Sequence, residues 1–461
     1  MKRGVNGLKG FEKVREDLNK VGKGFCLAKW NQVSILLQTG QTHSCHHPVP
    51  HYIPLEEIKE NPSALHNTKF KKLQRKTMLE GGRPKECDYC WNVEDSNKES
   101  FSDRILKSGE SWALPHFDKI KELKGNEDVF PPYVEISFSN QCNMACAYCD
   151  VKSSSKWQQE IGKLGSYPTS GNYNNTEWMQ NLPIPHKEPN PYVDAFWKWW
   201  PDLYRDLHTF RITGGEPLLS KDTFKVLDSI IEEENPNREL VLSINTNMMV
   251  PDDLIDKFIE KVNIITKEKK VKEFQVFTSV DTWGSDAEYI RNGLIFTKFW
   301  DNCNKFLKEC PIPSLTFMVT YNALSVFNFD KFIEGVYDLK SNYMNEHRLF
   351  PTNCCVIDIS YLRHPTHQTV RVLPKDTWSL IQKQVDLMKS LQRDENGNEY
   401  FTDMEISKLE RIFDWLNSDI NERELKRNRK DFGIFFKEHD KRRGTSFLEV
   451  FPKLEKLYNL G

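Results

Sequence analysis

Residues 139–150 read Ser-Asn-Gln-Cys-Asn-Met-Ala-Cys-Ala-Tyr-Cys-Asp, which places Cys142, Cys146 and Cys149 in the spacing Cys-x3-Cys-x2-Cys. The stretch directly follows an apolar run, Tyr133 to Ser139, that is typical of a β-strand. Three thiolates on one short loop can ligate three irons of a [4Fe-4S] cluster and leave the fourth iron open to a substrate or cofactor. On a helix these positions would be i, i+4 and i+7, so three buried cysteines on one helical face are the alternative.

Outward from this loop, the chain repeats a short apolar run, a turn and a longer amphipathic stretch, which is the pattern of β/α units. The six predicted strands are Tyr133 to Ser139, Thr209 to Thr213, Leu240 to Ile244, Phe274 to Val280, Leu315 to Thr320 and Val356 to Tyr361. The predicted helices are Asp194 to Asp206, Lys221 to Glu234, Asp252 to Val262, Ala287 to Leu307 and Asn328 to Leu339. This α/β alternation favours a parallel sheet with helices outside it, either closed into a barrel or left open.

We expect three regions along the chain. Residues 1–130 hold four cysteines and a Pro/His-rich passage, residues 131–370 hold the β/α repeat, and residues 371–461 consist of charged amphipathic segments that predict a helical C-terminal extension. Between the first two strands, Gly162 to Pro191 is rich in Gly, Asn, Tyr and Pro, which predicts a long loop.

Composition narrows the class of protein. The chain of 461 residues has 64 Lys and Arg against 66 Asp and Glu, so no strong overall field attracts nucleic acid or an anionic membrane. Its longest apolar stretches, such as Val33 to Leu37, are far shorter than the roughly 20 residues of a membrane-spanning helix, and its N-terminus lacks the apolar segment of a signal peptide. Seven of the 11 cysteines fall into two closely spaced groups, which favours metal ligation in a reducing compartment over disulfides. We therefore expect a cytoplasmic protein without a membrane anchor, and nucleic acid is disfavoured as a partner.

The three-cysteine loop after a first strand resembles the radical S-adenosylmethionine (SAM) superfamily, and the resemblance spans about residues 131–365. It implies a partial (β/α)6 barrel and a SAM molecule chelated by the open iron. An electron from the cluster would cleave SAM to methionine and a 5′-deoxyadenosyl radical, which abstracts a substrate hydrogen. The resemblance thus gives Cys142, Cys146 and Cys149 the catalytic role and implies an electron donor such as flavodoxin or ferredoxin.

Further motifs resemble the SAM contacts of this superfamily. Residues 214–217 read Gly-Gly-Glu-Pro and are similar to the GGEP motif that holds the SAM amino group, although the same tetrapeptide also suits an ordinary turn. Residues 243–247 resemble the polar strand end that faces the ribose, where Asn is also a common turn residue. The implied cofactor-binding residues are Tyr148, Gly214, Gly215, Glu216, Asn245, Asn247, Ser279 and Arg291.

Two of these residues belong to a pattern seen in SPASM-type radical SAM enzymes. Ser279 begins a Ser-x-Asp sequence, and Arg291 lies twelve residues after it. The resemblance implies that the serine and the arginine bind the SAM carboxylate, which a guanidinium can contact bidentately. A surface arginine on the next helix is the alternative. Tyr148 resembles an aromatic residue that touches the adenine, and it could equally belong to the core.

A second group of cysteines lies in the N-terminal region. Cys26 and Cys45 follow the spacing Cys-x13-Gly-x4-Cys, and Cys87 and Cys90 form Cys-x2-Cys. Two thiolate pairs, the first on a hairpin with a glycine turn, can fill a tetrahedral metal site or all four corners of a cubane. With the run Leu79 to Trp91, this spacing resembles the twitch domain, a shortened relative of SPASM that binds an auxiliary [4Fe-4S] cluster, here in an N-terminal position.

Zinc is the competing interpretation of this second group, because Cys-x2-Cys is typical of structural zinc sites. The nearby histidines, which we interpret as loop residues, are His43, His46, His47 and His51. We interpret the four remaining cysteines, Cys303, Cys310, Cys354 and Cys355, as buried structural thiols.

SPASM and twitch relatives commonly modify peptides or oxidise small molecules, so the resemblance implies one of these two substrate classes. Two other classes remain open. Basic segments at Lys69 to Lys76 and Lys426 to Lys430 would suit an RNA-modifying radical enzyme, although a charge run is usually a solvated helix face. The other is a non-catalytic iron-sulfur or zinc scaffold. The tail segment Asp440 to Leu448 resembles a closing segment of the N-terminal twitch group, and a solvated basic turn is its default interpretation.

Overall fold

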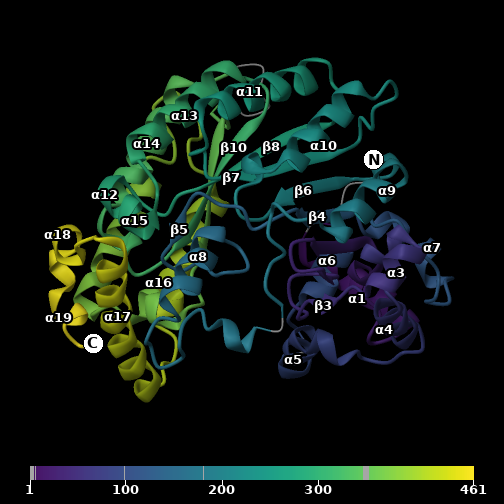
Figure 1. The fold of residues 1–461 in the computed structure, drawn as a ribbon, viewed down its shortest axis with the longest axis horizontal. Helices are drawn as coiled ribbons and strands as arrows, with labels where there is room; N and C mark the ends of the chain where they lie inside the picture. The colour runs from purple at the N-terminus through teal and green to yellow at the C-terminus, as the bar shows by residue number, and fades with distance from the viewer. Residues whose placement is uncertain (1–4, 6, 98, 180, 346–351) are drawn as a thin grey trace.

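The computed structural model describes residues 5, 7–97, 99–179, 181–345 and 352–461. Within these residues, a nine-stranded sheet has the strand order β11-β10-β8-β7-β6-β4-β1-β2-β3 (Figure 1). All six predicted strands are present, as β4 (Tyr133–Ser137), β6 (Thr209–Thr213), β7 (Val241–Thr246), β8 (Glu273–Ser279), β10 (Ser314–Tyr321) and β11 (Cys355–Tyr361). Neighbours among these six strands are parallel, which confirms the predicted α/β class. β3 and β11 form the two edges of the sheet, and a closed or partial barrel stays a prediction.

The two faces of these strands differ, because successive side chains of a strand point to opposite faces. One face is apolar and buried, and its side chains include Val134, Ile136, Phe210, Ile212, Leu242, Ile244, Val276, Phe317 and Ile357. The helices along the outside of the sheet are α9 (Pro191–Arg205), α10 (Lys221–Glu232), α11 (Asp252–Lys267), α13 (Phe296–Glu309) and α14 (Phe329–Asn342) (Figure 1). The opposite face carries partly buried polar residues, among them Glu135, Arg211, Asn245 and Gln275. The partly buried polar side chains of these strands therefore lie on the face opposite the apolar layer.

One predicted helix is wrong. The stretch Ala287 to Leu307 is divided into α12 (Gly284–Ile290), the short strand β9 (Arg291–Asn292) and α13. β9 pairs with β5 (Ala145–Cys146), which lies inside the cysteine loop. Apolar residues continue at helical spacing on both sides of the break, so the sequence pattern does not reveal it. The long-range pairing of β9 with β5 interrupts the helix, and Gly293, with a φ of +104°, forms the turn.

The N-terminal region shares the sheet with the β/α repeat. β1 (Gln32–Leu36) runs parallel to β4, and β2 (Gln41–His43) and β3 (His51–Tyr52) extend the sheet antiparallel. The predicted hairpin with a glycine turn is confirmed, because Gly40 joins β1 to β2 at a φ of +62°. Around the hairpin lie α1 (Gly7–Val21), α2 (Ala28–Asn31), α3 (Leu55–Glu60), α4 (Lys69–Leu79), α5 (Asp88–Ser96), α6 (Asp103–Ser108) and α7 (Phe117–Lys121).

The basic helix α4 is only partly exposed to solvent. Lys71 and Arg75 are fully buried. The Lys71 ammonium donates to Thr42 Oγ1 at 3.2 Å, and the Arg75 guanidinium donates to Asn67 Oδ1 at 2.8 Å. Two of the basic residues that could have contacted RNA therefore stabilise the fold of the N-terminal region instead.

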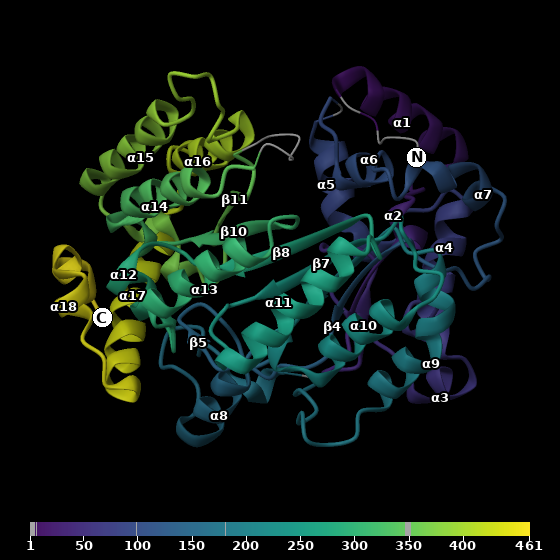
Figure 2. The ribbon, with the colours of Figure 1, turned by 90° about the horizontal axis from the view of Figure 1, so that it is seen from above.

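The C-terminal region is helical, as predicted, and comprises α15 (Trp378–Ser390), α16 (Asp403–Leu416), α17 (Glu422–Arg443), α18 (Phe447–Val450) and α19 (Glu455–Tyr458). Its last helices lie at the opposite end of the molecule from the N-terminal region (Figure 1, Figure 2). Of the predicted long loop, Gly162 to Pro191, the described residues 165–179 and 181–190 are a loop interrupted by one helical turn at Thr176–Trp178, and its first residues belong to α8 (Ser155–Leu164). None of the helices in the described part of the chain combines the length and the apolarity that crossing a membrane requires.

Candidate active site

The carboxyl ends of the parallel strands surround a cavity of about 210 Å³. All three cysteines of the first group and all eight residues with predicted SAM contacts line it. These eleven residues are Cys142, Cys146, Tyr148, Cys149, Gly214, Gly215, Glu216, Asn245, Asn247, Ser279 and Arg291. Residues separated by up to 149 positions in the sequence thus meet in one site, because the ends of neighbouring parallel strands lie at one edge of a sheet.

Side chains from other elements hold the backbone of the cysteine loop. The four consecutive carbonyls of residues 144–147 each accept a hydrogen bond from a different side chain. The donors are Ser154 Oγ at 2.7 Å, Arg443 Nη1 at 2.6 Å, Trp157 Nε1 at 2.8 Å and Gln368 Nε2 at 3.0 Å. The carbonyl of Cys149 accepts from Tyr173 and Asn174. Because the short pairing of β5 with β9 is the loop's regular ladder, these side-chain donors satisfy carbonyls of the loop and fix where the three thiols lie.

The two glycines after β6 allow the cysteine loop to approach. A Cβ on Gly215 would lie 2.4 Å from the carbonyl oxygen of Gln141, and Gly214 has a φ of +126°. The Gly215 N–H donates to Ser139 O at 3.1 Å, and the Glu216 N–H donates to Gln141 O at 2.7 Å. The Gly-Gly pair is therefore required for contact with the cysteine loop, whatever else it binds.

Glu216 is buried, with 2% of its surface exposed, at the junction of the loop after β6 and the end of β7. Its carboxylate accepts hydrogen bonds from Thr246 Oγ1 at 2.8 Å, Asn247 N at 2.6 Å and Leu218 N at 3.0 Å. Burial raises the pKa of Glu216 to about 7, and these three donors oppose that rise. The three donors do not fully compensate for burial, so ionising the Glu216 carboxyl costs free energy. A cationic group that binds beside it would lower this cost.

This raised pKa predicts a pH dependence of folding stability. Between the ordinary value of 4.5 and the folded value of about 7, folded Glu216 keeps a proton that the unfolded chain releases, so stability falls as pH rises through this window. The wild-type protein should lose about 3 kcal/mol relative to Glu216→Gln between pH 4.5 and pH 7.5, because one pKa unit corresponds to about 1.4 kcal/mol. Urea unfolding of both metal-free proteins across this range measures the difference, and parallel stability curves would contradict it.

Arg291 is held by a buried carboxylate. Its Nε and Nη2 donate to the two oxygens of Asp281 at 2.9 and 3.1 Å, and Nη2 also contacts the Tyr148 hydroxyl at 2.5 Å. The Thr320 N–H donates to the same carboxylate at 2.9 Å. The alternative of a surface arginine is wrong, because Arg291 is 6% exposed and its Nη1 lies 3.6 Å from Cys146 Sγ.

The donor set fits an iron-sulfur cluster. Three thiols face one cavity, Arg291 points an N–H at the Cys146 sulfur, and the Met144 N–H donates to Cys142 Sγ at 3.4 Å. Such N–H···S contacts and thiolate ligation are what a cluster requires. Burial raises the pKa of Cys142 to about 12 and also raises the pKa values of Cys146 and Cys149. In the metal-free protein these thiols are protonated, so metal binding must release protons.

The four N-terminal cysteines also meet. Cys26, Cys45, Cys87 and Cys90 line one pocket, and the other residues of its wall include Lys29, His47, Asp103, Arg104 and Lys107. Burial raises the pKa of Cys87 and of Cys90 to about 12. Across the residues described, no group of three or more His, Cys, Asp or Glu is arranged to hold a single metal ion.

Three of the four histidines near this pocket have other partners. His47 contacts Asp103 Oδ2 at 2.7 Å and stacks on Tyr89, His51 contacts Thr68 Oγ1 at 3.0 Å, and His43 contacts the carbonyl of Cys45. These contacts agree with their interpretation as loop residues rather than ligands. The remaining cysteines, Cys303, Cys310, Cys354 and Cys355, are buried, as predicted.

Several residues of the site are missing from the predicted set. Asp281 is the aspartate of the Ser-x-Asp sequence, and its short spacing to Arg291 could have indicated that the two side chains pair. Trp157 and Gln368 gave no signal, because their role depends on contacts across the fold. The interpretation of the tail as a solvated basic turn is wrong, because the side chains of Arg442 and Arg443 are each 4% exposed.

Residues 136–321 match the family model described as the Radical SAM superfamily. No curated protein matches the chain. The matched segment begins in β4 and ends with β10, so it contains all eleven predicted site residues that line the cavity described above. Arg443 and Gln368 lie outside it.

Proposed function

Since residues 136–321 form a radical SAM superfamily domain and the superfamily implies a [4Fe-4S] cluster with SAM, we propose that Cys142, Cys146 and Cys149 ligate that cluster and that the cavity beside them binds SAM. When bound, the cluster supplies the electron that cleaves SAM to a 5′-deoxyadenosyl radical, which abstracts hydrogen from a substrate. The single observation that carries this proposal is the meeting of all eleven residues in one cavity.

The protein's own residues would bind and orient the cofactor. Glu216 presents a buried carboxylate that suits the SAM amino group, and Asn245 and Asn247 present polar side chains from the end of β7. Arg291 has further donors besides those that Asp281 occupies, so it can contact the SAM carboxylate and remain paired.

We place the substrate along a polar row that joins the two cysteine sites. Ser34 on β1 is the register neighbour of His43 on β2 and of Glu135 on β4, and Glu135 is the neighbour of Arg211 on β6. At one end, His43 contacts the carbonyl of Cys45. At the other end, Arg211 Nε donates to the cavity residue Asn245 at 3.1 Å. Ser34 is buried and the other members of the row are partly buried, and their hydrogen-bonding groups favour a polar substrate.

A polar row between two cysteine sites supports peptide modification or oxidation of a polar small molecule. In this proposal the N-terminal region is a twitch-like module, and Cys26, Cys45, Cys87 and Cys90 hold an auxiliary [4Fe-4S] cluster that accepts an electron from the substrate or ligates it. Four thiols with cationic neighbours such as Lys29 and Arg104 support an anionic cluster at this position. A flavodoxin or a ferredoxin would supply the electron to the first cluster.

Anaerobic reconstitution with iron and sulfide tests both sites together. We expect about eight irons per chain, and 5′-deoxyadenosine after addition of SAM and a strong reductant. Cys87→Ala should lower the iron content to about four and retain deoxyadenosine formation, because only the auxiliary ligands change. About four irons together with bound zinc in the wild type would make the N-terminal site a zinc site. Absence of deoxyadenosine with a full first cluster would favour the scaffold alternative.

A further inference from the structure

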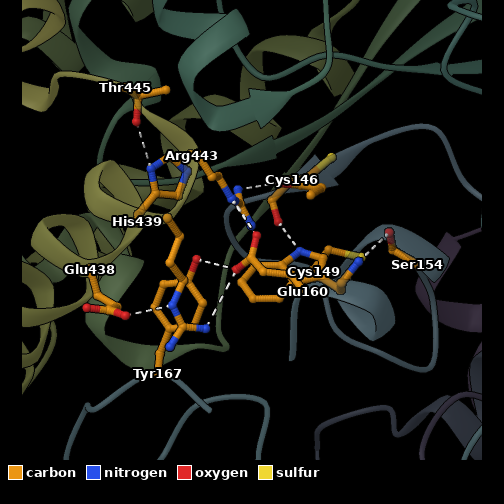
Figure 3. A network of polar contacts seen from close by, with 12 residues as sticks. Cys146, Cys149, Ser154, Glu160, Tyr167, Glu438, His439, Arg443 and Thr445 are labelled. Atoms are coloured by element: carbon orange, nitrogen blue, oxygen red, sulfur yellow. Dashed lines mark hydrogen bonds and ion pairs between the residues drawn. The ribbon is translucent and has the colours of Figure 1, made fainter. Parts of the chain in front are cut away.

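The C-terminal end of α17 reaches the cysteine loop from outside the matched domain. Arg443 Nη1 donates to the carbonyl oxygen of Ala145 at 2.6 Å, across a separation of 298 residues. Ala145 and Cys146 form the short strand β5. Figure 3 shows the Arg443 side chain extending from α17 toward Cys146 and Glu160. A residue of the C-terminal extension therefore contacts the backbone directly beside a cluster ligand.

Arg443 is fixed on several sides. Its Nε donates to Glu160 Oε2 on α8 at 3.0 Å, and its guanidinium lies 4.7 Å from the ring centroid of Trp157. Trp157 itself donates to the carbonyl of Cys146 at 2.8 Å. The Arg443 side chain is 4% exposed, and its Nη2 is buried without a hydrogen-bond acceptor in the part of the chain that the structure describes. Because arginine keeps its charge in proteins, a positive charge is buried behind the cysteine loop.

The neighbouring Arg442 provides a matched comparison. Its side chain is also 4% exposed, lies on the same helix and carries the same charge. It donates to the carbonyls of Gly165 at 2.8 Å and Ser166 at 3.1 Å, and its guanidinium lies 4.1 Å from the ring centroid of Tyr167. Its Nη1 also lies 3.8 Å from Glu160 Oε1, on the carboxylate that Arg443 contacts more closely, but none of these contacts reaches the cysteine loop. Burial and packing are thus similar for the two arginines, and only Arg443 hydrogen-bonds to the cysteine loop.

We propose that Arg443 is a positioning residue for the catalytic cluster, which holds β5 in place and puts a positive charge beside Cys146 that favours the reduced state of the cluster. The inference rests on the proposed function, since it requires a cluster on Cys142, Cys146 and Cys149. Reduction adds a negative charge, and reduction potentials of iron-sulfur clusters depend on nearby charge and hydrogen bonding. The C-terminal extension then contributes to SAM cleavage although it lies outside the matched domain.

The test is an EPR-monitored redox titration of the reconstituted protein, following the cluster whose signal changes when SAM is added. Arg443→Gln should shift its reduction equilibrium about tenfold toward the oxidised state, which for one electron is about 59 mV. Arg443→Lys keeps the charge and should stay within about threefold of the wild type. Arg442→Gln should lower the melting temperature of the metal-free protein and leave the reduction equilibrium unchanged.

A further variant changes the sign of the effect. Glu160→Gln removes the negative partner of Arg443 and leaves Arg443 in place. It should therefore shift the reduction equilibrium of the cluster toward the reduced state. This variant tests the same charge effect if Arg443→Gln fails to fold. Equal shifts in Arg442→Gln and Arg443→Gln, or no shift in Arg443→Gln and Glu160→Gln, would overturn the proposal. A wild-type protein that assembles no SAM-responsive cluster would instead refute the proposed function.

Discussion

Cys146→Ala should abolish formation of 5′-deoxyadenosine and lower the iron content from about eight to about four per chain. Cys146 is held in the site from two sides, because its sulfur lies 3.6 Å from Arg291 Nη1 and its backbone is part of β5. Without this thiolate, the remaining two cannot hold three irons of a cubane. Iron and sulfide analysis after anaerobic reconstitution, followed by chromatography of the SAM products, measures both effects.

Cys303→Ala is the matched control for this experiment. Cys303 is a fully buried thiol on α13, and it lies in neither cysteine group. Its removal should leave iron content and deoxyadenosine formation at the wild-type level. Deoxyadenosine formation that survives Cys146→Ala would show that the three-cysteine loop is not the site of SAM cleavage.

Asp281→Ala should cost about 3–5 kcal/mol of folding free energy, because it leaves the buried guanidinium of Arg291 without its counter-charge. Asp281 is fully buried and also accepts hydrogen bonds from the Tyr148 hydroxyl and the Thr320 N–H. The cost is a large part of the total stability of a typical domain, about 5–15 kcal/mol. Urea unfolding of the metal-free protein measures it, and the unfolding midpoint should fall strongly.

An exposed ion pair provides the control for this prediction. Asp252 contacts Lys298 at 2.7 Å, and its side chain is 75% exposed. Asp252→Ala should leave the urea midpoint unchanged, since exposed pairs are screened by water and salt. If Asp281→Ala unfolds at the same urea concentration as Asp252→Ala, the buried carboxylate does not stabilise the site as proposed.

The break between α12 and α13 illustrates where sequence reasoning fails. Apolar residues continue at helical spacing through Arg291, so the pattern predicts one helix. In the structure, the pairing of β9 with β5 brings Arg291 beside Cys146. Periodicity reports which residues can share a face, and it carries no information on a strand pairing across more than 140 residues.

The sequence by itself determined the six parallel strands, the position of the cysteine loop after the first of them, and eleven of the residues that line the cavity. The strands and the cysteine loop depend on alternation of apolar residues and on short spacings, which are local properties of the chain, whereas the other cavity residues followed from the resemblance of short motifs to a known family. Only the tertiary structure decided that β1 joins the sheet beside β4, that β9 pairs with β5, and that Arg443 holds the carbonyl of Ala145. Each of these depends on groups that are distant or unpatterned in the sequence, and burial in the folded chain is what pairs their charges and hydrogen bonds.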